Sequence, residues 1–149
     1  MSPNWFQRLF GNEADGAARR NRPLPTGTPS DLLKRATAHK EEGNWSAAID
    51  CLRAAHLGIA KGNDEYPIST FLRLPMYLHA SGRRDEAWAE FNKLIVDGYP
   101  NQIRKASLIP MDHSAVYDKI RLCLQREKRA REAVKFGILS TVCWEIGLK

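Results

Sequence analysis

The chain has 149 residues, of which 43% are hydrophobic and 27% are charged, with a formal net charge of +6. This composition is typical of one globular domain, and no apolar run approaches the roughly 18–20 residues of a membrane span. Three widely spaced cysteines, and four histidines without HxxxH or HExxH spacing, argue against a disulfide framework and a zinc site. The first ten residues are too short and too polar for a signal peptide. We therefore expect a cytoplasmic domain without cofactor or metal.

Residues 1–27 are expected to form a flexible tail, because 19–27 lack periodicity and contain turn and linker residues. Four large apolar side chains near the start would share one face of a helix: Trp5, Phe6, Leu9 and Phe10. Such a stripe predicts either peripheral membrane contact or docking on a partner. The alternative is that these residues fold back onto the domain or stay disordered.

Residues 28–149 are expected to form one α-helical domain, since no segment has a convincing strand pattern. The predicted helices cover 29–42, 45–60, 66–80, 85–96, 112–125 and 129–146. Thr28 and Asp112 are expected to cap the first and fifth helices. Pro75 should kink or split the third helix, because it removes a hydrogen bond and clashes with the preceding turn. In the sixth helix we expect the inner face to be formed by Ala130, Ala133, Val134, Gly137, Ile138, Thr141, Val142 and Trp144.

An internal repetition links two of these helices at a constant offset of 39 residues. The first copy contains Gly43, Trp45, Ala48, Leu52 and Ala55, and the second contains Gly82, Ala87, Phe91 and Leu94. This pattern resembles tetratricopeptide repeats, although Arg84 replaces the aromatic residue and Pro75 occupies a small-residue position. A third copy is indicated only by Tyr117, Leu124 and Ala133, without a glycine at the turn. The resemblance implies a short right-handed array of two to three antiparallel helix hairpins.

In that family, the first helix of each pair lines a concave groove. The groove positions implied here are Leu33, Thr37, Lys40, Glu41, Leu72, Met76 and His79. Leu33 and Thr37 stand where the family's Lys and Asn carboxylate clamp would begin, so a clamp for a terminal carboxylate is not expected. Leu72 and Met76 indicate an apolar groove for a hydrophobic side chain or an amphipathic helix. Alternatively, they pack against the fifth helix or the tail.

Residues 119–135 carry a local excess of positive charge. The candidate basic patch consists of Arg121, Arg126, Lys128, Arg129, Arg131 and Lys135. It predicts contact with an acidic protein or with nucleic acid, and otherwise it is a solvated helix face.

The sequence contains no glycine-rich phosphate loop, nucleophile elbow or metal-ligand cluster. We therefore expect a non-enzymatic module that binds a protein or peptide with an acidic or apolar surface. Such a module would act as an adaptor, an assembly subunit or an immunity-type inhibitor. The alternative is a nucleic-acid-binding accessory protein that uses the basic patch.

Overall fold

The computed structural model of the chain describes residues 22–99 and 108–149. Within these ranges it is all-α, with six helices and no strand, as predicted. The helices are α3 (Pro29–Glu41), α4 (Trp45–Lys61), α5 (Ile68–Ala80), α6 (Arg84–Asp97), α7 (Pro110–Arg126) and α8 (Ala130–Gly147). The predicted apolar stripe Trp5, Phe6, Leu9 and Phe10 lies outside the described residues.

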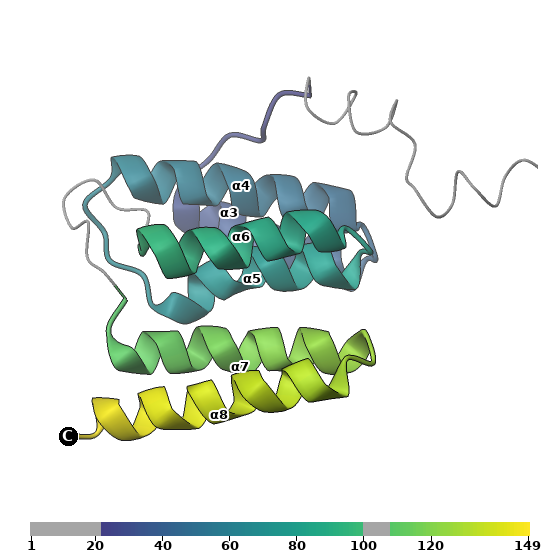
Figure 1. Cartoon of the computed structure of the whole chain (residues 1–149). Helices are drawn as coiled ribbons and strands as arrows, with labels where there is room; N and C mark the ends of the chain where they lie inside the picture. Colours follow the sequence, from purple (N-terminus) through teal and green to yellow (C-terminus); the bar gives the residue numbers. More distant parts are fainter. Residues whose placement is uncertain (1–21, 100–107) are drawn as a thin grey trace, which may run out of the picture.

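Consecutive helices pack in pairs, α3 with α4, α5 with α6 and α7 with α8 (Figure 1). The connection within each pair is so short that the two helices must run antiparallel. The middle pair contacts both of the others, because α5 packs on α4 and on α7. The three pairs are therefore stacked in chain order, and α8 forms the last layer (Figure 1).

The three turns inside these pairs have one backbone geometry. In each turn, a residue with positive φ donates its N–H to the carbonyl three positions earlier, and the next residue donates to the carbonyl five positions earlier. The residues with positive φ are Gly43 (75°), Gly82 (85°) and Lys128 (59°). This is the Schellman arrangement that commonly ends an α-helix, usually with glycine at the left-handed position. The third pair thus has the turn of the first two, with a lysine in place of the glycine.

A buried alanine follows each of these turns by five positions. Ala48, Ala87 and Ala133 are all buried, and their small side chains let neighbouring helices approach closely. The large side chains fill two cores. The first core joins α3, α4 and α5 through Leu32, Ile49, Leu52, Leu74 and Leu78. The second core joins α5, α6 and α7 through Phe71, Leu72, Phe91, Val116, Ile120 and Leu124.

The structure confirms the predicted cap of α3, but it differs from the prediction in the middle of α5 and at the start of α7. Thr28 Oγ1 accepts the N–H of Asp31, as its N-cap assignment requires. Pro75 does not split α5, which is one continuous helix with Pro75 buried inside it. The fifth helix was predicted to begin at Asp112, but α7 begins at Pro110, and Asp112 caps it from within the first turn. Asp112 lies in the first turn of α7, where its carboxylate accepts the N–H of Ile109 at 3.4 Å.

The part of the predicted tail that the structure describes lies against α3 and α4. The Arg22 guanidinium forms an ion pair with Asp50, and its Nη2 donates to Ser46 Oγ at 3.0 Å. Further along, Arg35 Nη1 donates to the carbonyl oxygen of Thr26 at 2.9 Å. Residues 22–27 contain neither helix nor strand, so a non-helical segment lies across the first helix pair.

Candidate functional site

Four of the predicted groove residues lie on α3. Thr37, Lys40 and Glu41 are exposed, whereas Leu33 is half-buried against the first core. Thr37 Oγ1 accepts a hydrogen bond from Arg73 Nη2 of α5 at 2.7 Å. The Lys40 ammonium lies 5.4 Å from the centroid of the Tyr77 ring. This side of α3 therefore faces solvent but is bridged to α5 by polar contacts.

The other three predicted groove residues lie on α5 and contact the third helix pair. Leu72 is buried in the second core, and Met76 Sδ lies 3.6 Å from Cys123 Sγ of α7. His79 is also buried, with Nε2 at 3.5 Å from Glu127 Oε2. These positions follow the alternative in which Leu72 and Met76 pack against the next helix. They do not form an open surface together with the four α3 residues.

The Glu127 carboxylate is the centre of a charged cluster beside the third turn. Its side chain is largely buried, and Arg84 Nε and Arg129 Nη1 each lie 3.8 Å from one of its oxygens. The neighbouring His79 ring meets Trp88 edge to face, with the ring centroids 6.0 Å apart. The cluster therefore connects the α5–α6 pair to the α7–α8 turn by charge.

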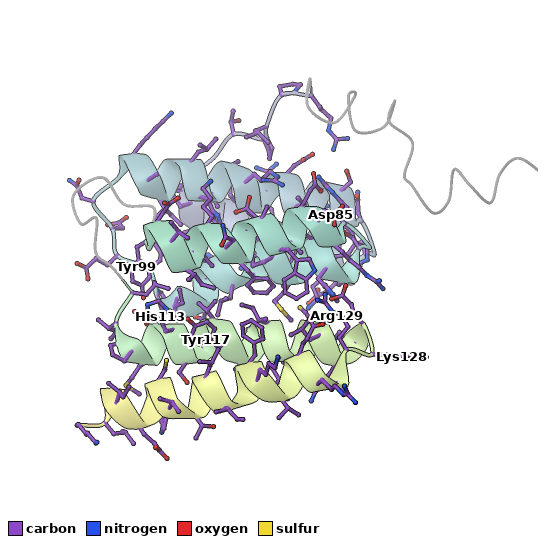
Figure 2. The ribbon with its side chains drawn as sticks, in the orientation of Figure 1. Asp85, Tyr99, His113, Tyr117, Lys128 and Arg129 are labelled. Carbon is purple, nitrogen blue, oxygen red and sulfur yellow. The ribbon has the colours of Figure 1, made fainter. Side chains whose placement is uncertain are left out.

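The predicted basic patch is partly neutralised. Arg121 Nη2 lies 2.8 Å from Asp118 Oδ1, and the Arg129 guanidinium pairs with Glu132 as well as with Glu127. The remaining members are exposed and form no ion pair with the described residues: Arg126, Lys128, Arg131 and Lys135. Lys128 and Arg129 lie at the end of the α7–α8 pair where the chain turns (Figure 2). The exposed positive charge thus gathers at this turn and on the first half of α8.

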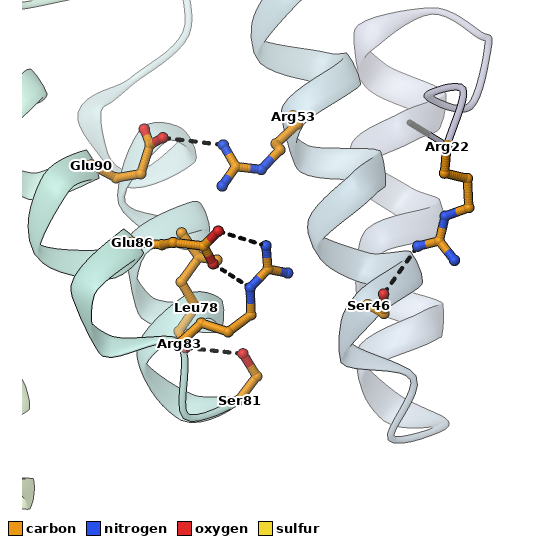
Figure 3. Close-up of polar contacts among 8 residues, drawn as sticks. All are labelled: Arg22, Ser46, Arg53, Leu78, Ser81, Arg83, Glu86 and Glu90. Carbon is orange, nitrogen blue, oxygen red and sulfur yellow. Dashed lines mark hydrogen bonds and ion pairs between the residues drawn. The ribbon is translucent and has the colours of Figure 1, made fainter. Parts of the chain in front are cut away.

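The sequence patterns did not indicate a cavity of about 450 Å³ that lies between α4 and α6. Its apolar lining comes from Leu57, Phe71, Leu74 and Leu94, together with Ala60, Gly98 and the Tyr99 ring. Four charged residues also line it: Arg53, Glu90, Lys93 and Asp97. Across the two helices, Arg53 Nη1 and Glu90 Oε1 form an ion pair at 3.2 Å (Figure 3). An apolar pocket with a few polar groups is the usual form of a binding site.

His56 gives this pocket one uncharged polar group. Its ring centroid lies 5.3 Å from that of Phe71, and its Nε2 is buried without a hydrogen-bond partner among the described residues. Burial, reinforced by the positive charges of Arg53 and Lys93, lowers the pKa of His56 to about 4. The imidazole is therefore neutral at pH 7, which matches the apolar character of the pocket.

The segment that precedes α3 lies at this pocket. Leu24 is among the residues that line it, and residues on both sides of Leu24 are held to α3 and α4 by the Arg22 and Thr26 contacts. Leu24 is itself still exposed. Within this chain, the apolar side chain of Leu24, on a non-helical segment, thus lies at the edge of the pocket.

The last helix also differs from the prediction. Of its residues, only Ala133 is buried, and Val134, Ile138 and Val142 are 62%, 59% and 46% exposed. The expectation that these three residues belong to the inner face was wrong, because α8 contacts α7 through its opposite side. Leu139, Trp144 and Ile146 are also exposed, so α8 carries a large apolar surface.

Among the described residues, no group of histidine, cysteine and acidic side chains could hold a metal ion. The helices of residues 22–99 and 108–149 also include none with the length and apolarity needed to cross a bilayer. Comparison with known proteins gave no match to a protein family, to a curated protein or to a solved structure.

Proposed function

We propose that the chain is a non-enzymatic protein-interaction module that takes an apolar side chain of a protein partner into the pocket between α4 and α6. The observation that carries this proposal is the pocket itself, with its apolar lining, its charged residues and Leu24 beside it. Such pockets for apolar anchors supply much of the binding energy of protein complexes. The partner segment would be non-helical, as residues 22–27 are.

The proposed scaffold is a divergent tetratricopeptide-like array of three hairpins in the cytoplasm. Its support is the common turn geometry at Gly43, Gly82 and Lys128, and the buried alanine five residues after each. Pairs of this kind bury a continuous core only by stacking, and the stacked surface is available for binding. In this proposal the partner meets the second helices of the first two pairs, α4 and α6.

The polar groups of the pocket fit the backbone that flanks an apolar anchor. The Arg53–Glu90 pair lines the pocket, and its guanidinium and carboxylate would contact the peptide groups on either side of the anchor. Because basic and acidic residues both line the pocket, the partner segment needs no large net charge. The exposed basic residues near the α7–α8 turn would add attraction for a partner with an acidic surface.

A capture experiment with two matched variants tests the proposal. Leu57 is 52% exposed at the pocket, and Val96 is 71% exposed on α6 outside the residues that line it. Both Leu57→Glu and Val96→Glu place a carboxylate on an exposed helix position, but only the first blocks the pocket. Extract of the native cell, with and without nuclease treatment, would be passed over the immobilised wild type and over both variants.

We expect proteins that are retained by the wild type and by Val96→Glu, and lost with Leu57→Glu. An identical set of proteins on all three columns would overturn the proposal. If retention disappeared on nuclease treatment and fell steeply with salt, the nucleic-acid alternative would replace it.

A further inference from the structure

The helix α8 has two opposite apolar sides, and α7 covers only one of them. On the inner side, Ser140 Oγ donates to the Ser114 carbonyl of α7 at 2.9 Å. A Cβ atom added at Gly147 would lie 2.3 Å from Met111 Cγ, which shows how closely α7 approaches there. At 3.6 residues per turn, Ile138 lies about 200° around the helix from Ser140. Ile138 therefore points directly away from α7.

Val134, Ile138 and Val142 form the α8 outer stripe, at intervals of one helical turn. All three are exposed, because α8 is the last layer of the array and no described helix covers its outer side. A helix with apolar residues on two opposite sides normally buries both sides, and terminal repeats normally present a polar outer face. The exposed outer stripe is therefore a candidate interface with another protein surface.

The sequence of this stripe is symmetric about Ile138. Val134 and Val142 each lie four positions from it, and Arg131 and Glu145 each lie seven positions from it. All four share the outward side of α8 with Ile138, because seven residues make almost two full turns. The two ends of the stripe therefore carry opposite charges, basic at Arg131 and acidic at Glu145, and both residues are exposed.

We propose that this face binds a second copy of the same chain, with the two α8 helices antiparallel about a two-fold axis at Ile138. In this arrangement Val134 of each copy meets Val142 of the other, and Ile138 meets its own equivalent. Arg131 of each copy lies beside Glu145 of the other, which gives two complementary ion pairs. A parallel arrangement would instead bring Arg131 against Arg131 and Glu145 against Glu145. Such a self-complementary patch is what a two-fold dimer requires.

The expected dimer is of moderate affinity. A helix of 18 residues is roughly 27 Å long, and one pair of such helices buries less area than the roughly 1,200–2,000 Å² of stable complexes. We therefore expect a dissociation constant in the micromolar range. The pocket between α4 and α6 involves no residue of α8, so the dimer would present two pockets and bind a repetitive partner with avidity.

The test is the oligomeric state of the full chain, measured by sedimentation over about 1 to 300 μM, a range that brackets a micromolar constant. Ile138→Glu places two carboxylates face to face at the axis and should give a monomer at every concentration. Val96→Glu is the matched control, since it adds the same charge at an exposed α6 position and should leave the dimer intact. Circular dichroism of both variants would report that the helices are preserved.

Charge exchange tests the antiparallel arrangement itself. Arg131→Glu and Glu145→Arg should each weaken the dimer about tenfold, because each turns two attractions into two repulsions. The double variant should regain the wild-type affinity. A wild type that stays monomeric, a dimer that tolerates Ile138→Glu, or a double variant weaker than both single ones would each overturn the proposal. These outcomes concern α8 alone and leave the pocket proposal to its own test.

Discussion

Replacing Lys128 with glycine is expected to stabilise the protein, although it removes a whole side chain. Lys128 has φ of 59° and is exposed, at the position that Gly43 and Gly82 occupy in the other two turns. The left-handed conformation costs an L-residue about 1–2 kcal/mol, and glycine escapes this cost. Glycine also has a larger backbone entropy in the unfolded chain, which lowers the stability by about 0.4–1 kcal/mol. The expected net gain in the free energy of unfolding is about 0.5–1 kcal/mol.

Two control variants separate the backbone effect from the charge. Lys128→Ala removes the same positive charge but keeps a Cβ atom, so it should give no such gain. Gly82→Ala is the reverse change at the equivalent turn, where φ is 85° and an added Cβ would meet no atom within 4 Å. Its cost, about 1 kcal/mol, should therefore come from the backbone conformation alone.

The assay is urea unfolding followed by circular dichroism, with the slope m checked for constancy. For a domain of this size, the expected gain corresponds to roughly a 1–4 °C higher melting temperature. If Lys128→Gly were no more stable than Lys128→Ala, the reasoning from the positive φ would be refuted.

Three further predictions concern the pocket and the helix contacts. Because the pKa of His56 is lowered to about 4, the unfolded chain takes up the proton first as the pH falls. Between pH 7 and pH 5, the free energy of unfolding of the wild type should therefore fall by about 2 kcal/mol more than that of His56→Phe. Equal losses for the two proteins in urea unfolding would contradict this. Ala87→Leu overfills a fully buried position and should cost about 1–3 kcal/mol, whereas Ala89→Leu on the exposed side should cost little. Ser114→Ala removes the buried bond from Ser114 Oγ to the Ser140 carbonyl, 2.7 Å long, and should lower the melting temperature by an amount equivalent to about 1–2 kcal/mol.

The helices were predictable because their signals are local. Thr28 before Pro29, and glycine at 43 and 82, mark helix ends through backbone chemistry that requires no distant contact. The third turn was not predictable in the same way, because lysine has no preference for positive φ and only the surrounding helices hold it there. The sequence also predicted that Pro75 could split its helix, but α5 stays continuous around this buried residue.

The orientation of α8 was missed for a different reason. Its apolar residues occupy both sides, so helical periodicity alone does not identify the side that faces α7. Ser140 and Gly147 were the residues that could have indicated it, because α7 approaches closely only where side chains are small. The expected inner residues Val134 and Ile138 are instead exposed.

The pocket was missed because it is built from residues far apart in the sequence. Arg53 and Glu90 are 37 positions apart and meet only when the first two helix pairs stack. The resemblance to tetratricopeptide repeats predicted a groove on the first helix of each pair, whereas the pocket is lined mainly by α4 and α6, which are the second helices. His56 and Leu57 were the available signal, because they extend the apolar surface of α4 beyond its main stripe.

The most direct test of the proposed function is photo-crosslinking from the pocket inside the native cell. A photoreactive amino acid at position 57 would lie at the pocket, and one at position 96 would lie on α6 outside it. The account predicts a discrete adduct from position 57 that is absent from position 96, with mass spectrometry locating the bond at an apolar side chain of another protein. The same adducts from both positions, or none from position 57, would contradict it.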